Sequence, residues 1–288
     1  SAEDVLQEIG RKSDLYLVAY REGTRYEEQF ETLDDTTVIG HSPAIQNDGV
    51  YVITGGTKGI GLEVAQYLAD KGAGHVALLA RSPFPPRDQW TEWLDQNRDR
   101  EVCETINRVM DLEKKGTSCS FYQVDIGHLD RLREVFDELR HTCGPIRGVV
   151  HSAGVPGEGM LMRKTEEQFS AVTGPKVQGT WALDQVTLED NLDFFLLFST
   201  ISSVFAAPGQ GDYAAANAYL DAFAAYRSKL GKRTLTMNWN TWRDTGMGVR
   251  YGINVDGVFS AIPTEQGIAW LDRAMGMARQ ICRQPRDA

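Results

Sequence analysis

The chain has 288 residues, of which 42% are hydrophobic and 24% are charged. This composition is typical of a globular protein and excludes disordered and fibrous chains. The formal net charge is −10, from 30 Lys and Arg against 40 Asp and Glu, which argues against a broad surface for DNA or RNA. At roughly 100–200 residues per domain, the length fits one large domain, or one domain with a fragment of another.

The cysteines are scattered and form no Cys-x-x-Cys pair; they are Cys103, Cys119, Cys143 and Cys282. They predict neither a metal site nor a disulfide framework, and they are typical of reduced thiols in a cytoplasmic protein. The longest apolar stretches, such as Phe194–Phe198, are too short to cross a bilayer, and no export signal is visible. The chain opens at Ser1 rather than at methionine, so we expect it to be part of a longer polypeptide.

The first residues, 1 to about 45, differ from the rest of the chain. They contain one apolar run, Leu15–Ala19, followed by charged sequence, and the stretch 43–49 predicts a turn-rich connector. The segment is too small to fold alone. We therefore place the main domain at residues 46–288.

From Val50 onward, short apolar runs alternate with helix-period segments, which predicts an α/β fold with a doubly wound, Rossmann-like parallel sheet. The predicted strands are brief and apolar, as strands buried on both faces should be: Val50–Thr54, Val76–Ala80, Ser120–Val124, Gly148–His151, Phe194–Ser199 and Thr234–Asn238. The predicted helices are Leu62–Lys71, Glu101–Lys115, Leu129–His141, Glu166–Val186, Tyr213–Leu230 and Thr264–Met277.

A glycine-rich loop follows the first of these strands: Thr54-Gly55-Gly56-Thr57-Lys58-Gly59-Ile60-Gly61. A strand before and a helix after are the context that a dinucleotide-binding fingerprint requires. Glycines let the backbone turn sharply and approach a pyrophosphate, and the helix N-terminus supplies free N–H groups. An ordinary tight turn is the alternative, but the surrounding βαβ pattern favours a cofactor site.

The end of the second strand favours NADPH over NADH. Arg81 stands 20 residues after Gly61 and is followed by Ser82, where an NAD site would present an acidic residue to the ribose. A guanidinium can bind the 2′-phosphate in bidentate fashion, and Lys58 adds a second cation. A solvated arginine at a strand end is the alternative interpretation.

Further cofactor contacts are predicted at the ends of the third and fourth strands, because ligands bind at the carboxyl ends of such sheets. Asp125 is suited to accept a hydrogen bond from the adenine amino group. The remaining predicted contacts are Ile126 and the run His151-Ser152-Ala153-Gly154.

Tyr213 and Asn217 lie four residues apart in the run Tyr-Ala-Ala-Ala-Asn-Ala-Tyr, so their side chains share one face of an alanine-rich helix start. The small residues leave room for a ligand. Just upstream, the strand at 194–198 leads into Ser199-Thr200-Ile201-Ser202-Ser203, which places hydroxyl groups at the carboxyl end of a buried strand.

These motifs together resemble the short-chain dehydrogenase/reductase superfamily. Most members carry a lysine four residues after the catalytic tyrosine; here that place is Asn217, and Lys176 stands upstream in Gly-Pro-Lys-Val-Gln-Gly-Thr-Trp. In this placement of lysine and asparagine the chain resembles the ketoreductase domains of modular polyketide synthases and animal fatty acid synthases. The runs Asn238–Trp242 and Gly246-Met247 also resemble polyketide synthase ketoreductases, and the match covers about residues 46 to 280.

The resemblance implies a role for each residue of the site. Tyr213 would be the general acid that protonates the carbonyl oxygen, while Lys176 and Asn217 would orient groups and relay protons. The family's serine stands 13 residues before the tyrosine, where this chain has Thr200, which offers the same hydroxyl on a stiffer side chain. The less favoured hydroxyls are Ser199 and Ser202, and a solvated helix lysine is the alternative for Lys176.

The resemblance also implies a substrate, a β-ketoacyl thioester carried by an acyl carrier protein, with an α-keto substrate left open. Two stereochemical fingerprints of the family are missing: Pro156-Gly157-Glu158 replaces a Leu-Asp-Asp motif, and Phe205 replaces a tryptophan. The alcohol configuration is therefore left open. The glycine-rich run 243–263 resembles a lid over the substrate, with an inert surface loop as the alternative; the predicted substrate and lid residues are Phe205, Gln210 and Met247.

The expected partners are the carrier protein with its phosphopantetheine-linked chain and neighbouring synthase domains in the same polypeptide, without nucleic acid or membrane. Residues 1–45 resemble the tail of the structural subdomain that precedes such catalytic domains. Two other functions stay open: a free-standing short-chain reductase of small ketones, and a non-catalytic domain that binds NADPH, for which Thr200 is the supporting observation.

Overall fold

The computed structural model describes residues 2–11, 18–27, 30, 44–157, 159–205, 208–252 and 260–281. The chain divides into two compact units, Ser1–Ile39 and Gly40–Ala288. In the described parts of the chain, no helix combines the length and the apolar character needed to cross a membrane. Cys103, Cys119 and Cys143 are free thiols, whereas Cys282 lies outside the described residues.

The first unit contains a helix and a hairpin that the sequence patterns did not predict: α1 (Ala2–Ile9), β1 (Val18–Arg21) and β2 (Thr24–Glu27). The two strands pair antiparallel. Tyr20 and Arg25 of the hairpin donate hydrogen bonds of 2.6–2.7 Å to the carboxylate of Glu8 on α1. Of the predicted apolar run, residues 15–17 lie outside the described residues, and Val18 and Ala19 open β1.

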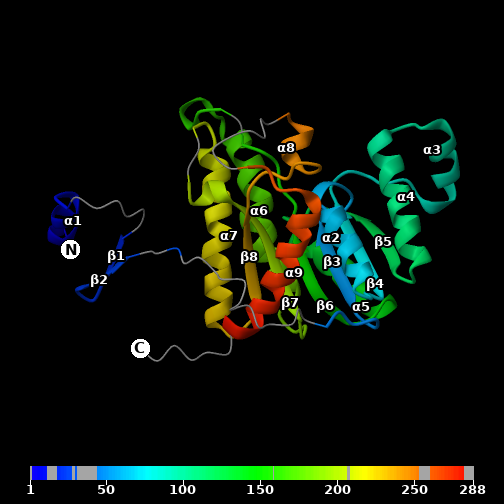
Figure 1. Cartoon of the computed structure of the whole chain (residues 1–288), viewed down its shortest axis with the longest axis horizontal. Helices are drawn as coiled ribbons and strands as arrows, with labels where there is room; N and C mark the ends of the chain where they lie inside the picture. Colours follow the sequence, from blue (N-terminus) through cyan, green and yellow to red (C-terminus); the bar gives the residue numbers. More distant parts are fainter. Residues whose placement is uncertain are drawn as a thin grey trace. The chain divides into compact units, whose positions relative to one another are not determined.

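The second unit is built on a six-stranded sheet with helices on both faces (Figure 1). The strand order is β5-β4-β3-β6-β7-β8, and every neighbouring pair is parallel. The strands are β3 (Val50–Thr54), β4 (His75–Ala80), β5 (Ser118–Gln123), β6 (Ile146–His151), β7 (Phe194–Thr200) and β8 (Thr234–Trp239). The predicted doubly wound α/β fold is confirmed.

Each face of the sheet has its own layer of helices. One face packs against α2 (Gly59–Asp70), α4 (Arg100–Lys114) and α9 (Thr264–Ile281); the other packs against α5 (Leu129–Thr142), α6 (Glu166–Val186) and α7 (Gly211–Lys229). Alternate residues of a strand point to opposite faces, so Tyr51 and Ile53 of β3 enter the first core and Val50 and Val52 enter the second. Burial on both faces explains why residues 50–53 of β3 are apolar.

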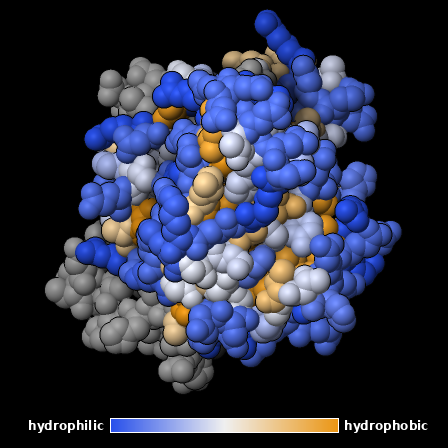
Figure 2. All heavy atoms as spheres, turned by 90° about the vertical axis from the view of Figure 1, so that its right-hand side faces the viewer, coloured by the Kyte–Doolittle hydropathy of each residue, from blue (hydrophilic) through white to orange (hydrophobic). Residues whose placement is uncertain are grey.

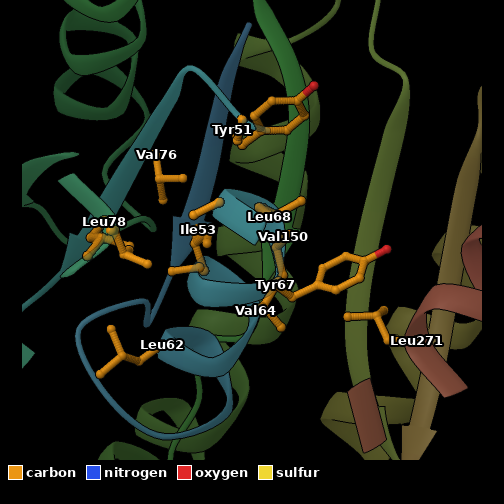
Figure 3. Packing of buried hydrophobic residues seen from close by; sticks show 14 of the residues in the cluster. Tyr51, Ile53, Leu62, Val64, Tyr67, Leu68, Val76, Leu78, Val150 and Leu271 are labelled. Carbon is orange, nitrogen blue, oxygen red and sulfur yellow. The ribbon is translucent and has the colours of Figure 1, made fainter. Parts of the chain in front are cut away.

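Helix α2 is fixed on the sheet by its apolar side. Val64 and Leu68 of α2 pack over Ile53 and Leu78 of the sheet, with Leu271 of α9 in the same cluster (Figure 3). This packing holds the first turn of α2 at the carboxyl end of β3, where the glycine-rich loop lies.

One helix of the second unit was not predicted, α3 (Trp90–Gln96), which follows the short 3-10 turn η1 (Arg87–Gln89). Trp90 is buried and packs edge-on against Phe84 and Phe121. A helix this short has no clear period in the sequence, and tertiary packing decides its formation. Figure 2 looks onto the side that carries α3 and α4, where the surface is mainly hydrophilic and apolar side chains are exposed in small groups.

The predicted lid segment is described at its two ends, while residues 253–259 lie outside the described residues. Trp242 pairs with Ile262 in an isolated parallel bridge, and the backbone N–H of Thr264 donates to the Asp244 carboxylate (3.0 Å). The described part of the segment contains the short helix α8 (Met247–Arg250). These contacts bring the two described ends of the segment together after β8.

Candidate active site

The glycine-rich loop lies between β3 and α2, at the point where the strand order reverses between β3 and β6. Gly55 and Gly59 have φ values of +67° and +58°, which favour glycine. A Cβ on Gly61 would lie 2.5 Å from the carbonyl oxygen of Gly55 and 2.7 Å from Oγ of Ser152. The loop therefore requires glycine both for its turns and for its close contact with the end of β6.

The loop is held from the side by α4. Thr105, which is buried, donates from its hydroxyl to the carbonyl oxygen of Thr57 (2.7 Å). Nζ of Lys58 lies 3.6 Å from a carboxylate oxygen of Glu101. No side chain among the described residues caps the first N–H groups of α2, so they are available to an anion.

The lid segment touches the same loop. A Cβ on Gly59 would lie 3.4 Å from Cα of Gly246, which precedes α8. Arg250, at the end of α8, approaches Glu101 at 3.4 Å. Met247, a predicted lid residue, opens α8 and is half-buried. The start of the lid segment therefore lies directly against the predicted cofactor loop.

His151, a predicted cofactor residue, is fully buried at the end of β6. Its Nδ1 lies 2.7 Å from the Thr54 hydroxyl, and its Nε2 lies 3.0 Å from the carbonyl oxygen of Pro175 in α6. A carbonyl only accepts, so Nε2 carries the proton and Nδ1 accepts from Thr54. Burial, and then the charge of Lys176, lower the pKa of His151 well below 6.5. The side chain is a neutral link that joins β3, β6 and α6.

The residues after His151 pack against the glycine-rich loop. Oγ of Ser152 donates to the carbonyl oxygen of Thr54 (2.6 Å), and the N–H of Ala153 donates to the hydroxyl of Thr54 (3.2 Å). A Cβ on Gly154 would lie 3.0 Å from Cε of Lys176. The end of β6 thus connects the predicted cofactor loop with the predicted catalytic lysine.

Lys176 is buried in α6, with 3% of its surface exposed, which rules out the solvated lysine of the alternative interpretation. Its Nζ donates to the carbonyl oxygen of Phe198 in β7 (2.8 Å). Burial lowers the pKa of Lys176 to about 7, and the negative charge of Asp221 opposes this shift. At neutral pH the Lys176 side chain is therefore present both as the ammonium and as the neutral amine.

Tyr213 lies in the first turn of α7, and Thr200 lies at the end of β7. Burial raises the pKa of Tyr213 to about 12, against a smaller opposing effect of the Thr200 side chain. Asn217 is fully buried one turn later, and its Nδ2 donates to the carbonyl oxygen of Tyr213 (2.8 Å). Its Oδ1 is buried without a hydrogen-bond partner among the described residues.

The three candidate hydroxyls have different partners. Ser199 donates to the carbonyl oxygen of Asn217 (3.2 Å), and Ser202 donates to Oε1 of Gln210 (3.2 Å). Thr200 is the one of the three whose side chain affects the pKa of the Tyr213 phenol. This agrees with the position beside the tyrosine that the family resemblance implied for it.

The other predicted cofactor residues line the carboxyl ends of β4 and β5. Arg81 and Ser82 are exposed directly after β4, and Asp125 is exposed after β5. Ile126 is buried, and a Cβ on Gly179 of α6 would lie 2.7 Å from its Cδ1. The side chain of Ile126 thus serves the packing of α6, while the three polar residues face solvent.

The predicted substrate residues lie around the start of α7. Gln210 is the N-cap residue of α7, and Phe205 is exposed after the 3-10 turn η3 (Ile201–Ser203). Glu158 of the atypical Pro-Gly-Glu run lies outside the described residues. Gly157 of the same run lies against α7, because a Cβ there would approach Cβ of Tyr213 to 2.9 Å.

Sequence reasoning missed three charged residues that border this site. Asp221 of α7 accepts hydrogen bonds from Ser203 (2.6 Å) and Asn238 (3.0 Å). Lys164 and Asp212 form a buried ion pair beside Tyr213. Asp221 and Asp212 lie in the Tyr213 helix, but a sequence pattern does not tell a buried acidic residue from a solvated one.

This arrangement defines a class of protein. A doubly wound sheet, a glycine-rich loop at the switch point, and a tyrosine, a lysine, an asparagine and a hydroxyl at the end of β7 are the features of the short-chain dehydrogenase/reductase superfamily. Such proteins bind a nicotinamide cofactor. The residues here fit one, because the loop glycines allow a close approach and, in the described part of the chain, the first N–H groups of α2 carry no side-chain cap.

Comparison with known proteins identifies the branch of the superfamily. Residues 49–244 match the KR domain family. The chain is 36% identical over 202 residues to 6-methylsalicylic acid synthase of Penicillium patulum, covering 70% of this chain and 11% of that protein. It is 35% identical over 201 residues to a phenolphthiocerol/phthiocerol polyketide synthase of Mycobacterium tuberculosis, covering 69% and 11%. The chain thus spans about a tenth of the length of these relatives.

The solved structures that this chain resembles are also ketoreductases. A ketoreductase domain from the bacillaene assembly line has a TM-score of 0.77 at 26% identity, covering 95% of this chain and 62% of that one. An N-terminal ketoreductase from the macrolactin assembly line has a TM-score of 0.68 at 31% identity, covering 88% and 46%. The chain belongs to the KR domain family, the ketoreductase domains of polyketide synthases, and is thus an oxidoreductase domain.

Proposed function

We propose that this domain uses NADPH to reduce a β-ketoacyl thioester on an acyl carrier protein to the hydroxyacyl product. The observation that carries the proposal is the cluster at the end of β7. There the Thr200 side chain acts on the phenol of Tyr213, and Lys176 is buried against the same strand and packs against Gly154, which follows β6. Membership of the KR domain family supports the same reaction class.

In this proposal Tyr213 is the proton donor. With its pKa raised to about 12, the phenol is fully protonated at neutral pH, which is the form that a general acid requires. The Thr200 hydroxyl offers a second hydrogen bond to the carbonyl oxygen as negative charge develops there. The reduced nicotinamide, when bound, supplies the hydride.

Lys176 and Asn217 support this proton transfer. Asn217 holds the carbonyl oxygen of Tyr213 and so fixes the turn of α7 that carries the phenol. Lys176, with a pKa of about 7, can return a proton to the site after Tyr213 has donated one. Its hydrogen bond to Phe198 keeps the ammonium at the end of β7.

The choice of NADPH is supported by charge. Arg81 is exposed directly after β4, the place from which a side chain of this fold meets the cofactor ribose. Lys58 lies in the glycine-rich loop with its ammonium partly exposed. A guanidinium and an ammonium at this end of the sheet suit the 2′-phosphate that distinguishes NADPH.

The relatives support a synthase context. The two described above are multidomain synthases several times longer than this chain, so we propose neighbouring domains and an acyl carrier protein as its partners. We propose the cytoplasm as its location. We also propose that residues 1–45 are the remnant of a structural subdomain and its linker, ahead of the catalytic domain at 46–288.

Turnover by the wild-type domain and by Tyr213→Phe tests the proposal, with NADPH and a panel of β- and α-ketoacyl pantetheine thioesters and simple ketones. We expect a strong preference for β-ketoacyl thioesters, and a loss of about 100-fold or more in kcat for the variant with unchanged NADPH affinity. The matched control is Tyr219→Phe, because Tyr219 lies on the same helix and stacks on Phe223. Chiral chromatography of the product would give the alcohol configuration.

Each other outcome has a distinct meaning. Near wild-type turnover by Tyr213→Phe would remove Tyr213 from its role. Equal turnover of simple ketones would indicate a free-standing reductase. NADPH binding without turnover of any substrate would indicate a non-catalytic domain.

A further inference from the structure

A buried ion pair lies directly beside the proposed proton donor. Lys164 pairs with Asp212, and their side chains are 6% and 0% exposed. Lys164 follows the 3-10 turn η2 (Leu161–Arg163) and precedes the N-cap Thr165 of α6, while Asp212 is the second residue of α7. The pair therefore joins the segment before α6 to the first turn of α7.

A contribution to the free energy of unfolding does not by itself explain why this ion pair is buried. Removing two charges from water costs free energy that their attraction often fails to recover, so a buried pair is weak evidence of a stabilising role. This pair has a further contact: Oδ1 of Asp212 accepts a hydrogen bond from the backbone N–H of Tyr213 (2.9 Å). The N–H groups of a first helical turn have no partner within the helix, so the carboxylate satisfies one of them.

Two glycines show how closely the neighbouring segments pack around the pair. A Cβ on Gly157, in the loop after β6, would lie 2.5 Å from Oδ1 of Asp212 and 2.9 Å from Cβ of Tyr213. A Cβ on Gly211 would lie 2.7 Å from Cδ1 of Leu161 in η2. Because the packing is this tight, a shift of Asp212 would also move Tyr213.

We propose that the Lys164–Asp212 pair is a positioning device for Tyr213. Lys164 holds the Asp212 carboxylate, the carboxylate holds the N–H of Tyr213, and the phenol is thereby directed at Thr200. With Asn217 bonded to the carbonyl oxygen of Tyr213, the peptide groups on both sides of this residue are fixed. The inference rests on the proposed role of Tyr213 as proton donor.

The chain offers a matched control pair. Asp184 of α6 and Arg227 of α7 form an ion pair with exposures of 9% and 3%, so this pair also ends on α7 and is similarly buried. Arg227 also contacts Phe195 and Thr234, which lie at the amino-terminal ends of β7 and β8. The control pair is therefore at the opposite end of the sheet from Tyr213.

The experiment measures kcat, NADPH Kd and thermal stability for Lys164→Met, Asp212→Asn and the double variant. We expect each single variant to lose about tenfold in kcat with an NADPH Kd within about twofold of wild type, and the double variant to lose no more than the worse single variant, because the pair acts as a unit. The control variants Arg227→Met and Asp184→Asn should lower stability and leave kcat within about twofold.

Several results would overturn the inference. One is a lower stability with unchanged kcat in all three variants, which is the signature of a purely structural pair. Another is losses that multiply in the double variant. If the pair variants do not fold, Gly157→Ala tests the same contact from the loop after β6; it should lower kcat at unchanged NADPH Kd, and an unchanged kcat contradicts the inference.

Tyr213→Phe separates this inference from the proposed function. If Tyr213→Phe abolishes reduction while the pair variants keep their kcat, only the positioning role fails. If Tyr213→Phe keeps full turnover, the proposed function of the site fails with it.

Discussion

Two buried cations, at opposite ends of the same sheet, have very different surroundings. Arg227, at the amino-terminal end, pairs with the Asp184 carboxylate and lies 4.0 Å from the centre of the Phe195 ring. Lys176, at the carboxyl end, donates to the backbone carbonyl of Phe198, with the charge of Asp221 acting on it through space. Lys176 lies on α6 and Arg227 lies on α7, and each residue is 3% exposed.

The pKa values express this difference. Burial lowers the pKa of Arg227 to about 10, so the guanidinium keeps its charge at neutral pH. Burial lowers the pKa of Lys176 to about 7, so its charge changes near neutral pH. A paired and stacked cation suits a structural brace, whereas a cation held by one carbonyl suits proton exchange. Arg227 therefore stabilises the folded state, whereas the buried charge of Lys176 destabilises it.

The largest expected effect is on Lys176→Met. We expect kcat to fall by about 100-fold or more, because the relay is lost, while the domain becomes more stable by about 1–4 kcal/mol at pH 6. The pKa of Lys176 is lower in the folded state, at about 7 against 10.5, so the destabilisation is full below pH 7 and declines as pH rises toward 10.5. Chemical denaturation of wild type and variant from pH 6 to 10 measures this; a constant difference contradicts it.

Arg227→Met should show the reverse pattern. It removes one of the two cations that pair with the buried Asp184 carboxylate and leaves Lys232 at 3.6 Å. We therefore expect a loss of up to about 3–5 kcal/mol in the free energy of unfolding, with kcat within about twofold of wild type. Denaturation and steady-state kinetics on the same preparation measure both. A large loss of kcat in the folded variant would show that the two ends of the sheet are not separable.

Arg81→Ala tests the assignment of the carboxyl end as the cofactor end. Loss of the guanidinium should raise the KM for NADPH by about tenfold, with little change for NADH, which lacks the 2′-phosphate. Arg131→Ala, on the exposed surface of α5, is the control. Equal effects on the two cofactors would remove Arg81 from phosphate recognition.

The smallest expected effect is a pH shift in Asp221→Asn. The Asp221 carboxylate raises the pKa of Lys176, so its neutralisation should lower that pKa further. The alkaline limb of kcat/KM should then move to lower pH, because Lys176 loses its proton earlier. Asp137→Asn, on the surface of α5, is the control and should leave the profile unchanged. A shift to higher pH would contradict this coupling between Asp221 and Lys176.

The elements that form the carboxyl end of the sheet could be predicted from the sequence, whereas the buried charged residues beside Tyr213 could not. Val50–Thr54 and the glycines after it form a local pattern whose meaning depends on neighbours in the chain, so the strand, the turn and α2 could be predicted. The family resemblance implied a hydroxyl 13 residues before Tyr213, and the Thr200 side chain at that place affects the pKa of the phenol.

Features that depend on tertiary contacts could not be predicted in this way. The Lys164–Asp212 pair joins residues 48 positions apart, and its burial depends on how the segment before α6 meets α7. The neutral state of His151 depends on its burial and on the charge of Lys176 in another element. Helix α3 is too short for its period to be visible. In each case the residue type is ordinary, and the three-dimensional surroundings give it its role.

The roles of Lys176 and Tyr213 are tested most directly by the pH dependence of β-ketoacyl thioester reduction, compared between the wild-type domain, Lys176→Met and Tyr213→Phe. We predict that wild-type kcat/KM falls as pH rises through about 7, that Lys176→Met loses both activity and this dependence, and that Tyr213→Phe is inactive at every pH. A Tyr213→Phe variant with wild-type turnover and the same pH profile would contradict both roles.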